Sequence, residues 1–363
     1  MKTKNKILII SFPIFISFFL FANTSKAVVL FEDSFDSQAD WTSAQSTSVS
    51  VSDYNGGFFG NWTGFNNALT QCGAGITGRP GYNNFYVSSI AGYPIGAETC
   101  NGGSGKCWTK WQEACLAPAG NFDDADANLG YDLGQEYSDI YLRFYIKFPT
   151  SFSIIDGQAF KLYHVQHYNG GFTNPWNYFG RDTNNQPVVS GGIRRDADVG
   201  RIDFYTEARG YSNYYTHGFM FWPISTYEIA KAGGGIFDGA WHSIEIRVKA
   251  NSVINTADGL IEVWVDGSKL SHWQDYPAED INFTNSDNDL RGFRFLSVGG
   301  NNMSWTTACS DGSGNMAECE QWYAIDDVVF STTYVEHSYV IGGGTPPPAD
   351  TTPPSAPTGV EVQ

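Results

Sequence analysis

The stretch from Asp139 to Phe148, DIYLRFYIKF, is the feature that most restricts the fold of this chain. Apolar residues alternate in it with Tyr141, Arg143, Tyr145 and Lys147, and a period of two is that of a β-strand with two different faces. The apolar residues predict a core face. The opposite face carries rings and cations, which suit sugar rings and acidic groups because aromatic faces stack and guanidinium groups hold oxygens. This strand therefore predicts glycan recognition.

Similar runs recur along the chain between turn residues, among them FKLYHVQHY, GRIDFYTEA, WHSIEIRVKA, GLIEVWVDG and YAIDDVVFS. Helical periodicity is expected only over residues 224–231. Many short strands predict an all-β fold, an antiparallel β-sandwich with long decorated loops over residues 28–341. The main decoration is the Gly- and Asn-rich segment 53–128.

The two ends of the chain differ from the predicted sandwich. Three lysines precede the apolar run Ile7–Phe21, which is shorter than the roughly 20 residues of a spanning helix and contains Pro13. Residues 1–27 thus predict a signal peptide cut after Ala27, and a secreted or cell-surface protein without membrane insertion, rather than a membrane anchor. Residues 342–354 predict a Gly/Pro-rich linker.

The last residues, 355–363, lie in PPSAPTGVEVQ, which resembles the opening strand of a fibronectin type III module. This resemblance implies further domains C-terminal to the linker, or a vestige of one.

Charge narrows the range of partners. The chain has 21 Lys and Arg against 38 Asp and Glu, and four of the lysines lie in the predicted signal, which leaves 17 − 38 = −21. No nucleic acid is expected as a partner, because phosphate binding needs a basic surface. An acidic polysaccharide would need a local basic cleft.

The six cysteines are even in number, which in an exported chain predicts disulfides, with fifteen pairings open. We expect the close pair Cys309 and Cys319 to close one loop, and the other four to staple a second region. A zinc site is disfavoured, because the sequence has no CxxC pair and no histidine near these residues. The second group is Cys72, Cys100, Cys107 and Cys115.

Four pieces of the chain resemble the concanavalin A-like lectin/glucanase jelly rolls, which include laminin-G-like modules and several polysaccharide lyases. They are FEDSFDS, DIYLRFYIKFP, WHSIEIRVKAN followed by GLIEVWVDG, and YAIDDVVFST, and they run from about Leu30 to Thr333. The resemblance implies the fold and leaves the activity open, since this architecture hosts binders, hydrolases, lyases and spacers.

A glycoside hydrolase is disfavoured. The Glu-x-Asp-x-x-Glu strand of hydrolases in this superfamily has no counterpart here. The nearest pair, Asp203 and Glu207, would lie about 13 Å apart on one strand, too far for a retaining pair. Arg201 and Arg209 favour ion pairing or sugar binding instead.

The segment from Lys161 to Tyr168, KLYHVQHY, resembles the Gln-x-His strand of jelly-roll alginate lyases, with the order His164-x-Gln166 and His167 beside it. Such lyases need a group that neutralises a uronate carboxylate, a base and an acid. The resemblance implies Gln166 or Arg143 for the first role, His164 or a tyrosine for the second, and Tyr145 or Tyr205 for the third. A structural role for the histidine is the alternative.

Members of this superfamily frequently bind a structural calcium between their first and last strands. Glu32 and Asp33, with Asp326 or Asp327, occupy the corresponding places, and hard oxygen ligands suit Ca²⁺. An acidic sheet edge that resists strand addition is the alternative. The run Asp124-x-Asp126-x-Asn128 lacks the glycine and glutamate of an EF-hand and is interpreted as a turn.

Together these patterns predict a secreted sandwich that binds a polysaccharide on its concave sheet. A polysaccharide lyase that uses the same face and a non-enzymatic adhesion or spacer domain are the alternatives. The residues expected to act in catalysis are His164, Gln166, Arg143 and Tyr145, and those expected to bind the ligand are Lys161, His167, Tyr205, Glu207 and Tyr141.

Overall fold

The computed structural model describes residues 28–38, 41–42, 62, 64–69, 83–88, 100–103, 105–112, 125–150, 152, 159–166, 188–195, 201–209, 217–226, 235–254, 256–270, 283, 292–302 and 321–342. The predicted signal peptide and residues 343–363 lie outside these ranges. In the described part of the chain, no helix is long and apolar enough to cross a membrane.

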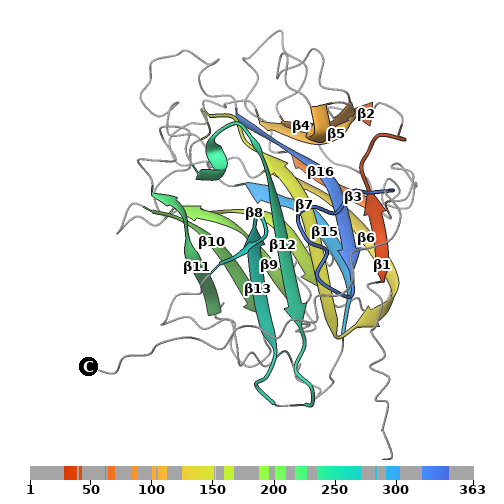
Figure 1. The fold of residues 1–363 in the computed structure, drawn as a ribbon, viewed down its shortest axis with the longest axis vertical. Helices are drawn as coiled ribbons and strands as arrows, with labels where there is room; N and C mark the ends of the chain where they lie inside the picture. The colour runs from red at the N-terminus through yellow and green to blue at the C-terminus, as the bar shows by residue number, and fades with distance from the viewer. Residues whose placement is uncertain are drawn as a thin grey trace, which may run out of the picture.

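Two antiparallel sheets form the molecule and lie over one another (Figure 1). In the nine-stranded sheet the order is β14 (Ser268–Lys269), β13 (Leu260–Val265), β12 (Trp241–Lys249), β7 (Asp139–Lys147), β16 (Gln321–Ser331), β5 (Cys107–Gln112), β4 (Asn83–Ser88) and β2 (Trp41–Thr42), and β1 (Val29–Asp33) also pairs with β16.

The seven-stranded sheet has the order β11 (His217–Thr226), β10 (Arg201–Arg209), β9 (Val188–Arg195), β8 (Ala159–Gln166), β15 (Phe293–Asn302), β6 (Ala125–Tyr137) and β3 (Gly64–Leu69). Short 3₁₀ turns are η1 (Asn101–Gly103) and η2 (Gly235–Phe237). The predicted all-β antiparallel sandwich is confirmed.

One hydrophobic core lies between the sheets. The apolar face of β7 contributes Leu142, Phe144 and Ile146, as its alternation predicts, and the seven-stranded sheet contributes Val165 and Val298. Both sheets supply buried side chains to this single cluster, so the apolar face of each sheet points toward the other sheet.

The segment 53–128, which the sequence predicts as a decoration of the sandwich, instead supplies β3, β4 and β5 to the two sheets. Two further sequence predictions about local structure are wrong. Residues 224–226 belong to strand β11 rather than to a helix, because they continue the ladder in which Thr226 pairs with Arg201. Residues 125–137 form β6 rather than a turn, and Asn128 pairs with Gly299 of β15. In both places strand pairing outweighs the local sequence signal.

Strand β16 contains a bulge between Asp326 and Val329, where Asp327 adopts a positive φ of 46°. The bulge lies where the partner on one edge of β16 changes from β5 to β1. Bulges reorient side chains, and here the backbone N–H of Asn101 donates to Asp326 at 3.0 Å while its amide donates to Asp327 at 2.7 Å.

The chain after β16 returns over the outer face of the nine-stranded sheet. Residues 332–342, called here the C-terminal strap, meet β7 and β12 through Arg143, Tyr145 and Glu245. Val335 in the strap is buried, and the Tyr334 ring lies 5.1 Å from that of Trp264. The strap therefore covers a sheet face that the sequence pattern suggests is open.

Candidate functional site

Strand β8 carries the strongest candidate site residues on the outer face of the seven-stranded sheet. Tyr163 and Val165 belong to the core. Because side chains alternate along a strand, His164 and Gln166 face away from it. Both are 2% exposed. The predicted pair His164 and Gln166 thus lies on one polar, buried sheet face.

Small polar residues flank His164 on both neighbouring strands. Ser297 of β15 and Ser190 of β9 lie directly opposite it in the ladder. The Ser297 hydroxyl lies 3.4 Å from Nδ1 of His164. Both serines are nearly fully buried, and His164 is the largest side chain among these three.

Two more predicted residues fall on the same sheet. Glu207 pairs with Ser190, and Tyr205 pairs with Gly192, so the register places Glu207 in the row of His164 and Tyr205 one row away. The structure describes only the backbone of these two residues. Lys161 of β8 pairs with Gly192 of β9. His167 lies outside the described residues.

Two buried polar atoms on this face have no hydrogen-bond partner within the described structure, the amide nitrogen of Gln166 and the side-chain oxygen of Asn128. Asn128 is 1% exposed and lies beside Leu129, which packs in the core. The sequence pattern predicts Asn128 as a turn residue and not as a site residue. The alternation in Asn128-Leu129-Gly130 is the signal that could have found it.

An aromatic ring also lies on this outer face. Phe295 pairs with Gln166 in the ladder and lies outside the core cluster. A Cβ on Gly130 would lie 2.2 Å from the ring of Phe295, so the glycine makes room for the ring. The face thus combines a ring with amide, hydroxyl and imidazole groups.

The structure separates Arg143, Tyr145 and Tyr141 from this group. They lie on β7 in the nine-stranded sheet, whereas His164 and Gln166 lie on β8 in the other sheet. The prediction that all of them converge on one face is wrong. Alternation fixes which residues share a strand face, but it does not say to which sheet that strand belongs.

Arg143 binds the C-terminal strap. It is 0% exposed, and its Nη1 donates to the carbonyl oxygens of Glu336 at 3.0 Å and Tyr339 at 2.8 Å. The Tyr145 hydroxyl donates to the carbonyl of His337. These two side chains hold backbone carbonyls of the strap, although Nε of Arg143 has no hydrogen-bond partner within the described structure.

Glu245 lies directly opposite Arg143 on β12 and is 3% exposed. Its carboxylate accepts the N–H of Val335 at 2.7 Å. Burial raises the pKa of Glu245 to about 8, although the Val335 hydrogen bond and the charge of Arg143 act in the opposite direction. Burial likewise lowers the pKa of Arg143. The strap is thus held by two buried side chains, the guanidinium of Arg143 and the carboxyl group of Glu245, each hydrogen-bonded to its backbone.

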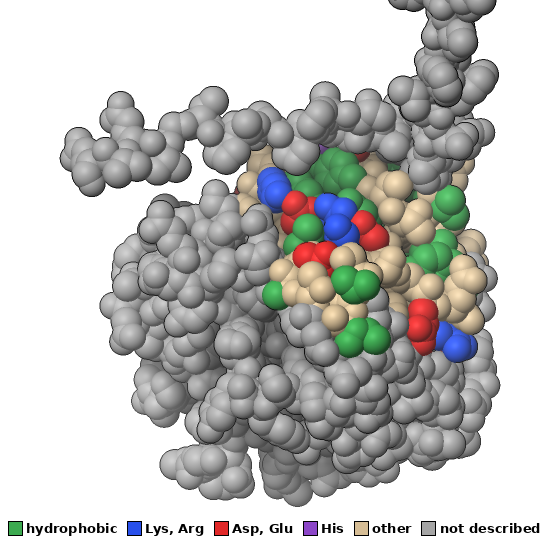
Figure 2. Space-filling model, turned by 90° about the horizontal axis from the view of Figure 1, so that it is seen from below, with side chains coloured by type: hydrophobic (Ala, Val, Ile, Leu, Met, Phe, Trp, Pro, Cys, Tyr) green, Lys and Arg blue, Asp and Glu red, His purple; other side chains and the backbone are tan. Residues whose placement is uncertain are grey.

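Tyr141 is buried within an ion-paired surface. Arg247 lies 5.3 Å from its ring and donates to Asp139 at 2.7 Å and Glu262 at 2.8 Å. Burial raises the pKa of the Tyr141 hydroxyl. Figure 2 shows basic and acidic side chains next to one another on the described part of the surface.

The predicted metal ligands point to different partners. Asp33 accepts N–H groups from Phe35 at 2.7 Å and Trp62 at 2.5 Å, whereas Glu32 accepts the hydroxyl of Tyr339 at 2.7 Å. Asp326 accepts backbone N–H groups beside the bulge. Burial, followed by the charge of Asp327, raises the pKa of Asp326 to about 9.

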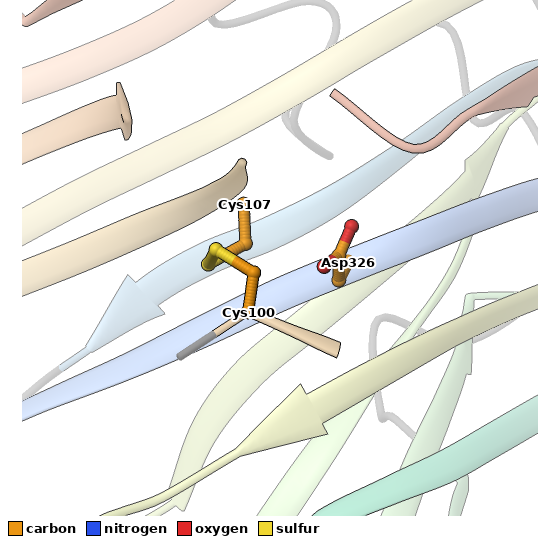
Figure 3. A group of neighbouring side chains, drawn as sticks. All are labelled: Cys100, Cys107 and Asp326. Atoms are coloured by element: carbon orange, nitrogen blue, oxygen red, sulfur yellow. A yellow bond between two sulfur atoms is a disulfide. The ribbon is translucent and has the colours of Figure 1, made fainter. Parts of the chain in front are cut away.

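Oxygen ligands of calcium lie about 2.4 Å from the ion, so they must lie close to one another. Among the described residues, the one group whose ligand atoms all lie within 4.8 Å is Cys100, Cys107 and Asp326 (Figure 3). Its two sulfurs form a disulfide, so they are not thiolate ligands. Glu32, Asp33 and Asp326 therefore do not fit a single calcium site in this conformation.

Calcium binding stays a prediction that melting temperature would check. If Asp326 and Asp327 bind a calcium ion with their carboxyl groups, added calcium will raise the melting temperature and a chelator will reverse the rise. An unchanged melting temperature would contradict calcium binding.

The disulfide Cys100–Cys107 confirms that the chain forms disulfides. It closes the loop that brings Asn101 to the bulge of β16. The expected pair Cys309 and Cys319 lies outside the described residues, as do Cys72 and Cys115.

No family model matches the sequence, and no curated protein matches it. Among solved structures, an alginate lyase from Chlorella virus has a TM-score of 0.41 at 13% identity, over 78% of this chain and 97% of that one. An endo-β-1,4-glucuronan lyase from Trichoderma reesei has a TM-score of 0.38 at 14% identity, over 76% and 97%. An endo-1,3-β-glucanase from Streptomyces sioyaensis has a TM-score of 0.37 at 13% identity, over 85% and 96%. At these values, function must be argued from the site itself.

Proposed function

We propose that this chain binds a polysaccharide on the outer face of the seven-stranded sheet, around His164 and Gln166. The observation that carries the proposal is the buried amide nitrogen of Gln166, which has no hydrogen-bond partner within the described structure. A buried donor without a partner costs about 1–3 kcal/mol. Such a cost is expected where a ligand supplies the missing partner.

The chemistry of this face suits sugar hydroxyls. Gln166 offers a donor and Asn128 offers an acceptor, and a hydroxyl group can serve either of them. Ser297 and Ser190 add hydroxyls beside His164. This combination favours a neutral or acidic glycan over an apolar ligand.

A polysaccharide lyase is the second candidate, and the position of His164 two residues from Gln166 favours it. In β-elimination from a uronate, a base takes the C5 proton, the bond from C4 to the leaving oxygen breaks, a C4–C5 double bond forms and an acid protonates the leaving oxygen. His164 is the candidate base, and the Gln166 amide is the candidate group for the carboxylate. Tyr205, on the same sheet, is the remaining candidate acid, since Tyr145 lies on the other sheet.

Affinity electrophoresis against neutral and uronate polysaccharides, with ultraviolet detection of unsaturated products, tests both candidates. We expect retardation of the full chain in at least one gel and a loss of more than tenfold in affinity in His164→Ala. Arg247→Ala, on the nine-stranded sheet, is the matched control and should bind as the parent does.

The outcomes separate the alternatives. Retention without product supports a binding module, and product that disappears in His164→Ala while retention persists supports a lyase. An absence of both retention and product for all polysaccharides would overturn the proposal and favour an adhesion or spacer domain.

A further inference from the structure

The imidazole of His242, at the start of β12, lies between two carboxylates. Its Nε2 is 3.0 Å from Oδ1 of Asp238, and its Nδ1 is 2.7 Å from Oδ2 of Asp266. Asp238 directly follows η2, and Asp266 occupies the β13–β14 turn with a φ of 50°. One ring thus joins two turns that are separate in sequence.

A neutral imidazole carries a single N–H and can donate to only one of these carboxylates, leaving a lone pair facing the other. Both contacts are favourable together only in the imidazolium form. We propose that His242 is protonated in the native protein and closes a pH-sensitive clasp between the turn after η2 and the β13–β14 turn.

The clasp holds parts of the core at one end of the sandwich. Ile236 and Phe237 of η2 are buried, and the Phe237 ring lies 5.2 Å from that of Phe152. On the other side, Oδ1 of Asp266 accepts the N–H of Ser243 at 2.9 Å. Loss of one imidazole contact therefore loosens η2 or the hairpin turn rather than an isolated surface side chain.

Among the described residues, the other titratable groups near the clasp come from the strap and from β7. His337 of the strap and Tyr145 of β7 interact electrostatically with Asp266. Lys147 of β7 pairs in the ladder with Trp241, the residue before His242. Asp238 and Asp266 are in direct contact with the ring, so they dominate the field at His242.

The hydrogen bond to Asp266, opposed by burial and aided by Asp238, raises the pKa of His242 above its ordinary 6.5. The pKa of His242 is therefore higher in the folded than in the unfolded chain. Protonation then stabilises the fold fully at pH values below the unfolded-state pKa, and this stabilisation is lost as pH rises through the folded-state pKa. Both carboxylates have lowered pKa values: burial raises each, but their hydrogen bonds outweigh it. The clasp therefore acts from about pH 4 to above pH 6.5.

An NMR titration of the histidine ring signals in the intact chain tests the clasp without any substitution. We expect His242 to titrate above 6.5 and Asp266→Asn to shift its pKa down. Asp258→Asn, which makes the same change in an exposed turn carboxylate, is the matched control and should leave the titration unchanged.

Thermal unfolding of the parent and His242→Gln from pH 5 to pH 9 gives a second readout. We expect the parent to melt about 2–4 °C higher at pH 5 to 6 and the gap to vanish as pH rises. Titration of His242 at or below 6.5, or parallel melting profiles across this range, would overturn the clasp. Glycan retention is not used as a readout, so failure of the proposed function would leave this test intact.

Discussion

Replacement of Arg143 by methionine is expected to lower the free energy of unfolding by about 3–5 kcal/mol, because it leaves two backbone carbonyls of the strap without the charged donor that binds them. Without the guanidinium, the Glu245 carboxyl stays buried without its neighbouring cation, and the carbonyls of Glu336 and Tyr339 lose a donor. Methionine keeps most of the volume, so the loss is electrostatic. Urea unfolding followed by tryptophan fluorescence measures it.

Arg247→Met is the matched control on the outer face of the same sheet. Arg247 is 23% exposed and forms ion pairs with Asp139 and Glu262, and such pairs contribute roughly 1 kcal/mol or less. The strap-binding role would be wrong if Arg143→Met lowered the free energy of unfolding no more than Arg247→Met does and instead abolished glycan retention. Arg143 would then contact the ligand, as the sequence pattern suggests.

Gln166→Met is expected to stabilise the free protein by about 1 kcal/mol while it weakens glycan binding more than tenfold. The substitution removes a buried amide nitrogen that lacks a partner and keeps the length of the side chain. Removing an unsatisfied group recovers its desolvation cost. A gain in stability with a loss of function is what a residue held ready for a ligand should show. Thermal unfolding and affinity electrophoresis on the same samples measure both effects.

Asn251→Leu is the control for this prediction. Asn251 is also a buried amide, but it donates to Val253 at 2.6 Å and accepts from Phe283 at 2.9 Å. Its replacement should therefore destabilise the protein. A loss of stability in Gln166→Met similar to that in Asn251→Leu would contradict the idea that the Gln166 amide waits for a ligand.

The sequence predicts the strands well because their signal is local. In DIYLRFYIKF the apolar residues form the core face, as their period of two requires. The opposite face was misinterpreted because its cover, the strap, follows nearly two hundred residues later and has no local pattern of its own. Rings and charges on a strand face look the same whether they await a sugar or hold another part of the chain.

The candidate site was only partly predictable for a related reason. His164 and Gln166 were found because they alternate with apolar neighbours, but the serines and Asn128 around them come from strands that are distant in sequence. Pairing of β8 with β9 and β15 decides which groups share the face, and that pairing is a property of the whole sheet. The placement of β7 and β8 in different sheets likewise depends on the pairing of all the strands and cannot be predicted from either strand alone.

The C-terminal strap also determines how the sandwich responds to mechanical load. A pulling force applied beyond Gly342 reaches the hydrogen bonds of Arg143 and Glu245 before it reaches the ladder between β16 and β7. The strap would peel first, and the layers that carry the polar face would stay folded under tension.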